Sequence, residues 1–164
     1  MLPPQEIAHV VLIGVGATAV MDIWLVLLLL FKIPMPSFAL IGRWVGNFPR
    51  GRFVHASMSE APRVTGELWL GWLIHYTVGL VYAGLLIAVQ GTEWSREPSL
   101  LPALAVGVGT VLFPLFVMQP AMGSGFAASR TPAPLANCLR SLANHAVFGA
   151  GLYLTALGIQ WMTR

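Results

Sequence analysis

Residues 7–31 read IAHVVLIGVGATAVMDIWLVLLLLF, a run in which only His9, Thr18 and Asp22 are markedly polar. A helix of about 20 apolar residues, within a range of about 17–25, crosses the hydrocarbon core of a bilayer. Three more runs of this kind follow, at residues 68–89, 101–118 and 142–162. All four are continuous rather than alternating, which favours helices over strands. We therefore predict an all-α integral membrane protein with four transmembrane helices in a single domain.

The composition excludes most other classes of protein. Of the 164 residues, 57% are hydrophobic and 9% are charged, whereas a soluble domain has about 25% charged residues. The mean hydropathy of +0.76 agrees with this deficit. The net charge of +3 comes from basic residues that form no run, so nucleic acid is not an expected partner and the lipid bilayer is. With Cys138 as the only cysteine, an intramolecular disulfide and a cysteine-rich metal site are excluded.

The charges predict which side of the membrane the loops occupy. Seven of the nine basic residues fall in the segments 32–67 and 119–141, and the other two are Arg96 and Arg164. Because positive charge is retained on the cytoplasmic side, we predict that both long loops are cytoplasmic and that both termini lie outside.

Two local features refine this topology. In residues 37–47, Phe38, Ile41 and Trp44 fall on one apolar face with Arg43 off it, which is compatible with a short interfacial helix or with an ordered loop. Pro114 removes a backbone hydrogen bond to the Thr110 carbonyl, so a kink is expected in the third span.

The chain also carries signs of a tandem duplication of a two-helix unit. The pattern A-S-x-x-x-A-P occurs at 56–62 and at 128–134, and each copy is followed by His-x-x-x-Gly, at His75 and His145. Upstream, GVG occurs at 14–16 and at 107–109. We interpret the two halves as parallel repeats that form a pseudo-two-fold four-helix bundle; the alternative is chance similarity between apolar segments. In the bundle, His75 and His145 would face each other at equivalent depth.

Polar residues inside the spans are the candidate site. Asp22 lies near mid-membrane, where a charge costs at least about 2.5–3.5 kcal/mol, so it must be protonated, paired or hydrated. We expect a ligand or proton site made of residues on three of the spans: Thr18, Asp22, His75, Asn144 and His145. The histidines lie on stripes of small residues, which favour close helix contacts. A satisfied hydrogen bond between helices is the alternative role for each of them.

Two further interactions are expected. His75 and His145 could ligate haem iron or, with Asp22, another metal, while Met21, Met118 and Met122 would suit Cu(I); packing is the alternative for the methionines, and no cofactor can be named. Glu67 and Arg140 stand at the entries of the second and fourth spans, which predicts a cytoplasmic ion pair.

Six stretches carry a resemblance to known sequences: ATAVMDIW (17–24), GRWVGN (42–47), RGRFVH (50–55), GELWLGWLIHY (66–76), residues 102–134 and HAVFGAGLYL (145–154). Together they resemble the bacterial membrane family called domain of unknown function 2938. The resemblance covers nearly the whole chain, and MQPAMGSGFAASRTP (118–132) is its most specific part. It implies a small multi-pass protein of the bacterial inner membrane, with periplasmic termini by the charge argument, and it implies no activity or ligand.

These observations favour a small binding or transport module over an enzyme, because no nucleophile–base set, Walker loop or dinucleotide fingerprint is present. The alternatives are a structural or assembly subunit of a larger membrane complex and a haem-, metal- or quinone-binding membrane protein. Four spans are few for a carrier, so a homodimer or a larger complex is expected with transport. The small ligand itself is not indicated.

Overall fold

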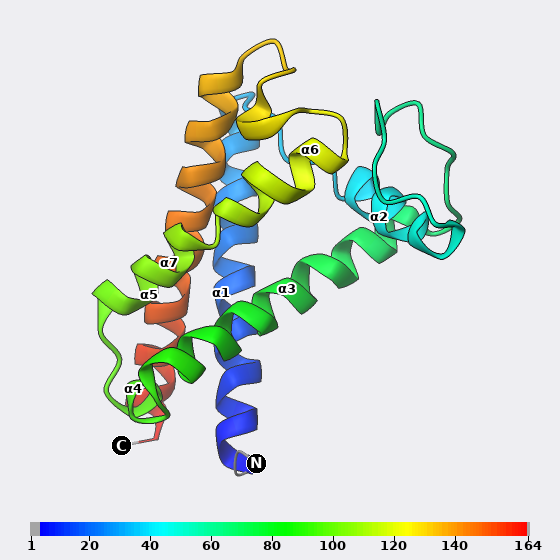
Figure 1. Ribbon diagram of the computed structural model, residues 1–164. Coiled ribbons are helices and arrows are strands. Elements are labelled where there is room, and N and C mark those ends of the chain that lie inside the picture. Colours follow the sequence, from blue (N-terminus) through cyan, green and yellow to red (C-terminus); the bar gives the residue numbers. More distant parts are fainter. Residues whose placement is uncertain (1–3, 164) are drawn as a thin grey trace. The chain divides into compact units, whose positions relative to one another are not determined.

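The computed structural model describes residues 4–163, so Arg164, one of the two basic residues expected outside, falls beyond it. No strand occurs in the described residues, and four helices there are long and apolar enough to cross a membrane (Figure 1). They are α1 (Pro4–Leu30), α3 (Glu67–Gln90), the stretch Leu100–Ala121, and α7 (Pro134–Met162). The predicted fold class, an all-helical chain with four membrane-spanning helices, is confirmed.

The chain divides into two compact units. The first comprises the residues up to Met35, Tyr76–Thr110 and the residues from Ala143 onward; the second comprises Pro36–His75 and Val111–Leu142. Three of the long helices therefore contribute to both units, and the units are described one at a time.

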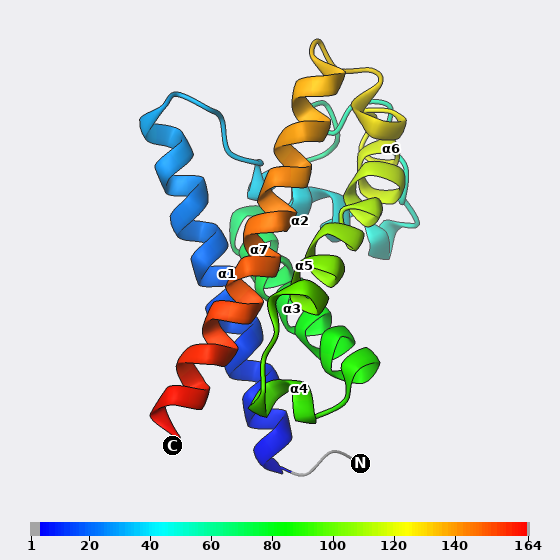
Figure 2. The same ribbon diagram turned by 90° about the vertical axis from the view of Figure 1, so that its left-hand side faces the viewer.

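The first unit is held together by close contacts between helices at small residues. A Cβ added to Gly107 of α5 (Leu100–Gly109) would lie 2.5 Å from Cα of Gly149 in α7, and one added to Gly151 would lie 3.0 Å from Cα of Ala17. Figure 2 shows this crossing of α1 by the later part of α7. Such residues let helix backbones approach closely, so the prediction that the small-residue stripes are helix interfaces is confirmed here. The buried side chains of this core come from all the elements of the unit: Ile13, Ala17, Ala83, Leu86, Ile87, Trp94, Ala103, Phe148, Leu152, Ala156 and Ile159.

The connection between α3 and α5 contains a helix that the hydropathy pattern does not reveal. Helix α4 (Glu93–Arg96) follows Gly91, whose φ of +83° is in the left-handed region that glycine adopts without strain. It buries Trp94, whose indole N–H donates to the Ser99 carbonyl at 3.2 Å. Trp94 is therefore part of the core and does not belong to a lipid-facing aromatic belt.

The third span is interrupted before its proline, as predicted. Helix α5 ends at Gly109, residues Thr110 and Val111 form a turn, and the chain then continues as the π-helix η2 (Pro114–Met118) and α6 (Gln119–Ala121). Because Pro114 has no N–H, the regular hydrogen-bond ladder cannot pass through it. Single π-turns of this kind are common at functional sites.

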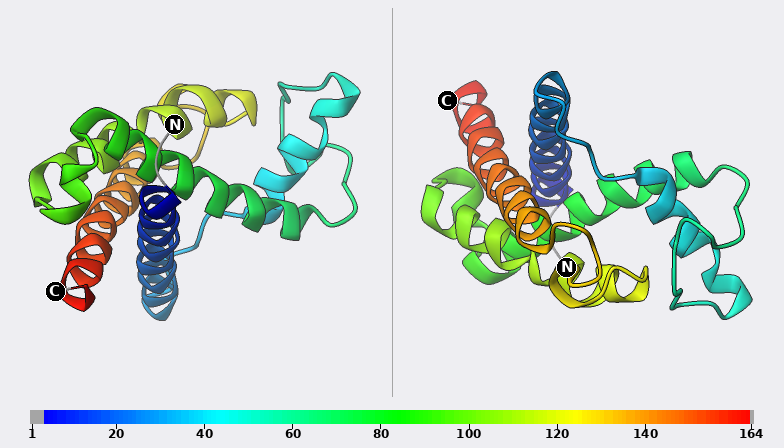
Figure 3. Two further views of the ribbon diagram at one scale, coloured as in Figure 1. Left: turned by 90° about the horizontal axis from the view of Figure 1, so that it is seen from below. Right: turned by 90° about the horizontal axis from the view of Figure 1, so that it is seen from above.

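In the second unit, residues 37–47 form a helix. Ser37 caps the start of α2 (Phe38–Gly46) by accepting a hydrogen bond from the Leu40 amide at 3.4 Å. A Cβ on Gly42 would collide with the Glu67 carbonyl and one on Gly71 with the Phe38 carbonyl, so α2 packs directly on the beginning of α3 (Figure 3). The helical alternative is therefore confirmed over the ordered loop.

The remainder of the second unit consists of short elements and the beginning of α7. The 3₁₀ helices η1 (Phe48–Arg50) and η3 (Phe126–Ala128) lie in the two long loops. Helix α7 begins at Pro134, eight residues before the expected start at Leu142. Ala127 and Ala128 have φ of +48° and +60°, which is sterically unfavourable for alanine and marks a strained turn in the loop.

Candidate functional site

Asp22, the one carboxylate in the middle of α1, is hydrogen-bonded to a neighbouring helix. The phenol of Tyr76 in α3 donates to Oδ2 of Asp22 at 2.8 Å, and both residues belong to the first unit. A hydrogen bond to an ionised group is stronger than one between neutral groups. In an apolar membrane interior it offsets part of the cost of burying the carboxylate. The structure thus supplies Asp22 with a partner that the sequence analysis did not name.

Asn144 is held by a tryptophan of the same α1. The indole Nε1–H of Trp24 donates to Oδ1 of Asn144 at 3.0 Å, and Asn144 is 4% exposed. Asn144 was expected to share a site with Asp22, and its side-chain oxygen accepts from the residue two positions further along α1. The bond joins α1 to α7 at a buried position, where an unsatisfied amide would be costly.

His145 forms hydrogen bonds with the C-terminal end of α5. Its Nδ1 lies 3.1 Å from the Thr110 hydroxyl and 3.2 Å from the Gly107 carbonyl, while that hydroxyl donates to the same carbonyl at 2.7 Å. Because the Thr110 proton is already donated, Nδ1 must carry the proton of the neutral imidazole. Nε2 is then an unprotonated nitrogen, since both hydrogen-bond contacts of the ring are made by Nδ1. His145 therefore presents a lone pair on a ring fixed from its other side, and the Tyr82 ring lies 6.4 Å from it.

Thr18 has a packing role in the structure. Its hydroxyl donates to the Gly14 carbonyl of its own helix at 2.8 Å, and its side chain is 1% exposed against Gly79. A hydroxyl that bonds back to residue i−4 and touches a facing glycine is occupied on both sides. Of the five candidate ligand residues, Thr18 is thus the least available to a ligand.

His75 belongs to the second unit and has aromatic surroundings. Its ring lies 4.7 Å from that of Phe38 in α2 and 5.8 Å from that of Trp72. His145 belongs to the first unit, so the expected pairing of the two histidines across a pseudo-two-fold axis stays a prediction.

Glu67 forms its ion pair with Arg43 of α2. Two parallel hydrogen bonds, Nε to Oε2 at 2.8 Å and Nη2 to Oε1 at 2.7 Å, make the contact bidentate. Nη1 also donates to the carbonyls of Met58 and Ser59. The pair is largely enclosed, with side-chain exposures of 7% and 18%. The bonds to Glu67 raise the pKa of Arg43 above its ordinary value, so the guanidinium stays charged.

This arrangement replaces the ion pair expected between Glu67 and Arg140. Nη1 of Arg140 lies 3.5 Å from Oδ1 of Asn137, one helical turn earlier in α7. Among residues 4–163, the ion pair of Glu67 is made with Arg43 and not with Arg140. The physical reason is that α2 lies directly on the first turn of α3, which brings Arg43 to Glu67. Arg43 had been placed off the apolar face of this helix, yet it is buried.

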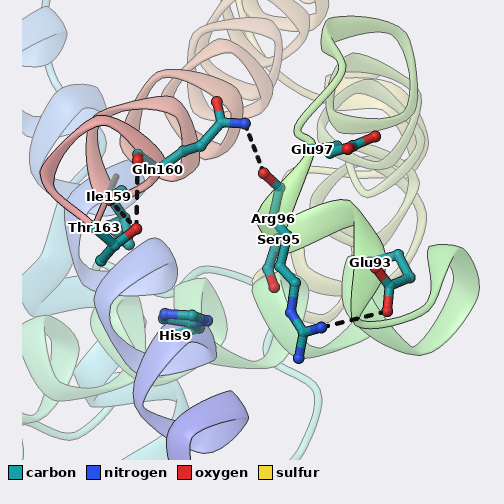
Figure 4. A pocket seen from close by; sticks show the side chains of 8 residues that line it. All are labelled: His9, Glu93, Ser95, Arg96, Glu97, Ile159, Gln160 and Thr163. Carbon is teal, nitrogen blue, oxygen red and sulfur yellow. Dashed lines mark hydrogen bonds and ion pairs between the residues drawn. The ribbon is translucent and has the colours of Figure 1, made fainter.

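A third polar cluster occupies the end of the first unit where α1 begins. Glu6, which is 5% exposed, accepts a hydrogen bond from Arg96 at 2.9 Å, and the Ser95 hydroxyl, which donates to the Thr92 carbonyl at 2.7 Å, lies 3.4 Å from its Oε2. Arg96 also pairs with Glu93 at 3.5 Å, and its carbonyl accepts from Gln160 at 2.7 Å. A cavity of about 330 Å³ opens beside these groups (Figure 4). It is lined by the following eight residues: His9, Glu93, Ser95, Arg96, Glu97, Ile159, Gln160 and Thr163.

Histidine, cysteine, aspartate and glutamate side chains form no group of three or more that could hold a metal ion within the described part of the chain. Ligation of haem or a metal in the first unit would rest on Nε2 of His145, and an axial haem ligand needs only one such nitrogen.

Sequence reasoning found the acidic and imidazole groups of the spans but missed the residues that bind them. Tyr76 and Trp24 lie one and two residues from a candidate, and Thr110 lies at the predicted kink. Each carries a polar atom that needs a partner when it is buried, but the sequence does not say which candidate it reaches. Glu6 and Arg96 carry no such signal, because they are separated by two spans.

Comparison with known proteins gives one match. A family model described as "Protein of unknown function (DUF2938)" matches residues 11–159. No curated protein matches the chain significantly, and no solved structure does.

Proposed function

The chain belongs to the family described as Protein of unknown function (DUF2938), and we propose its function from the site. The protein is a small membrane-embedded binding or transport module that carries a proton or a small cation at Asp22. The observation that supports this most directly is the hydrogen bond of 2.8 Å from Tyr76 to the Asp22 carboxylate inside a candidate span. Ionisable groups at this depth are rare and commonly mark proton or ion pathways.

The Asp22–Tyr76 pair has the chemistry that reversible proton uptake needs. The phenol stabilises the carboxylate while the group is charged and can turn to another acceptor when it is neutral, since a hydroxyl hydrogen rotates. His145 adds a base with an unprotonated Nε2 in the same unit. The hydrogen-bonded Asn144 and Trp24 join the helices that carry Asp22 and His145.

The test is proton flux into proteoliposomes that contain a trapped pH-sensitive dye, driven by a potassium-diffusion potential. We expect the purified protein to raise the flux above that of empty liposomes, Asp22→Asn to abolish the increase, and Tyr76→Phe to lower it. Tyr153→Phe is the matched control, because Tyr153 is a tyrosine that packs against the core of the same unit. A wild-type flux equal to that of Asp22→Asn would refute proton transport and favour a structural role.

A second candidate function, binding of haem or another cofactor, is favoured by the geometry of His145. In metal-binding histidines one ring nitrogen commonly donates to a backbone carbonyl or a carboxylate and leaves the other for the metal, and Nδ1 of His145 lies 3.2 Å from the Gly107 carbonyl. Visible spectra of the detergent-purified protein test this. A Soret band that is absent from His145→Ala but present in His9→Ala would support it, and a colourless protein would refute haem binding.

The proposal includes an orientation and an assembly. We propose that both termini are on the periplasmic side of the bacterial inner membrane, because seven of the nine basic residues lie in the two long loops, residues 32–67 and 119–141. A homodimer would double the four spans, and the A-S-x-x-x-A-P repeats support descent from a duplicated two-helix unit. Labelling of Arg52→Cys in a Cys138→Ser chain tests the orientation: a membrane-impermeant maleimide should react only after the inner membrane is opened.

A further inference from the structure

The two long loops of the second unit are joined by a short seam of backbone contacts. The His55 amide donates to the Ala121 carbonyl at 2.8 Å, and the Met58 amide donates to the Met122 carbonyl at 3.2 Å. A Cβ on Gly123 would collide with the Ala56 carbonyl, so the backbones of the two loop segments are in direct contact. The seam fixes residues 55–58 beside residues 121–123.

Three of the seven methionines gather at this seam. Met58 is 4% exposed in a cluster with Trp44 and Ala61, and Met118 and Met122 pack against that cluster. The Met122 amide donates to the Met118 carbonyl at 2.9 Å, as expected for residues four apart on one helical face. The side chains of Met58, Met118 and Met122 thus pack together in one cluster.

Two residues of these same segments, His55 and Gln119, have buried polar atoms without partners. Both ring nitrogens of His55 and Oε1 of Gln119 are inaccessible to solvent and have no hydrogen-bond partner in residues 4–163. His55 begins the seam, and Gln119 directly follows Met118 in the chain. Buried polar atoms in proteins are nearly always satisfied, and exceptions call for a specific explanation such as a bound ion.

We propose that His55, Met58, Met118 and Met122 form a binding site for Cu(I). Thioethers are soft ligands that select Cu(I), and an imidazole nitrogen is compatible with it. Thioethers carry no charge and imidazole binds a metal through an unprotonated nitrogen, which suits a monovalent ion, while hard divalent cations require carboxylate or carbonyl oxygens. A bound ion would use the lone pair of one His55 nitrogen and so remove one of the unsatisfied atoms. These residues belong to the second unit and Asp22 belongs to the first, and the proposal is independent of the proposed function.

The experiment is a Cu(I) titration of the full-length protein in detergent, under reducing and anaerobic conditions, in competition with bicinchoninate. It is done in a Cys138→Ser background, because Cys138 is the only thiol of the chain and a thiolate would bind Cu(I) by itself. We expect one tightly bound Cu(I) per chain, with sulfur and nitrogen neighbours in the X-ray absorption spectrum.

Matched substitutions assign the ligands. Met118→Leu, Met122→Leu and His55→Phe approximately keep the size of each side chain. Each is expected to weaken Cu(I) binding by more than about tenfold, because loss of a residue that merely supports a ligand already costs about 10–100-fold in metal affinity. The controls Met21→Leu and His9→Phe change the same residue types in the first unit and should leave the affinity unchanged.

The proposal is overturned if the Cys138→Ser protein binds no Cu(I), if the site variants bind it as tightly as the controls do, or if the spectrum of the bound ion lacks sulfur neighbours. The spectrum is recorded on the Cys138→Ser protein with all four ligands intact, so it decides even where a site variant fails to fold.

Discussion

Replacing Glu67 by alanine is expected to destabilise the protein strongly, because it leaves a buried guanidinium without its counter-charge. Arg43 is 6% exposed and gives two of its hydrogen bonds, at 2.7 and 2.8 Å, to Glu67. After the substitution only the carbonyls of Met58 and Ser59 remain as partners. These neutral acceptors satisfy the N–H groups in part but do not balance the charge.

The magnitude follows from the enclosure of the pair. Exposed ion pairs contribute about 0–1 kcal/mol, whereas removing one partner of a buried pair costs about 3–5 kcal/mol. With side-chain exposures of 7% and 18%, this pair belongs to the second class. We therefore expect a loss of about 3–5 kcal/mol for Glu67→Ala and a similar loss for Arg43→Ala. The double variant should lose clearly less than the sum, with a coupling of about 2–3 kcal/mol.

Unfolding in mixed micelles with increasing sodium dodecyl sulfate, followed by tryptophan fluorescence, measures these free energies; the chain has six tryptophans to report on it. The matched control is Arg52→Ala, which removes an exposed arginine from the same loop and should change stability by less than about 0.5 kcal/mol. A loss for Glu67→Ala no larger than that of Arg52→Ala, or single-variant losses that simply add, would refute the assignment of a buried and coupled ion pair.

Two further substitutions test the first unit. Gly107→Ala should lower the free energy of unfolding by about 1–3 kcal/mol, because its Cβ would lie 2.5 Å from Cα of Gly149. The control Gly109→Ala, whose Cβ meets open space, should be neutral or slightly stabilising in the same unfolding assay. Trp24→Phe should cost about 1–3 kcal/mol, because it leaves the buried Asn144 oxygen without its donor, and thermal inactivation followed by size-exclusion chromatography would show a lower midpoint; an unchanged midpoint would contradict that bond.

The membrane spans could be predicted because a single physical quantity defines them. A run of about 20 apolar residues has few alternatives to a membrane helix, and the four runs lie within long helices except for Phe31, the last residue of the first run. The start of α7 could not be predicted in this way. Residues 134–141, PLANCLRS, are too polar to extend the apolar run, yet they are helical, since a helix can continue beyond the hydrocarbon core wherever its backbone remains regular.

The candidate site was predictable in its acids and bases and not in its partners. Depth in the membrane singles out Asp22, whatever its neighbours, since the cost of a buried charge depends on its burial. Which donor reaches it depends on the rotation of α1 against α3, and sequence spacing does not encode that angle. The same limit explains Arg43: an amphipathic pattern assigns a charged residue to the solvent face, and only the packing of α2 on α3 brings Glu67 to it.

Three polar contacts of the first unit, those made by the candidate residues Asp22, Asn144 and His145, differ in what their loss would reveal. Trp24–Asn144 and Thr110–His145 are hydrogen bonds between groups that can all be neutral, so their removal primarily reports on the packing of α1, α5 and α7. Asp22–Tyr76 alone contains an acid. Asp22→Asn keeps a carbonyl oxygen that can accept from Tyr76 and removes only the group that titrates. A protein that folds as before with Asp22→Asn and yet loses proton flux would therefore separate transport from architecture, which no substitution at Asn144 can do.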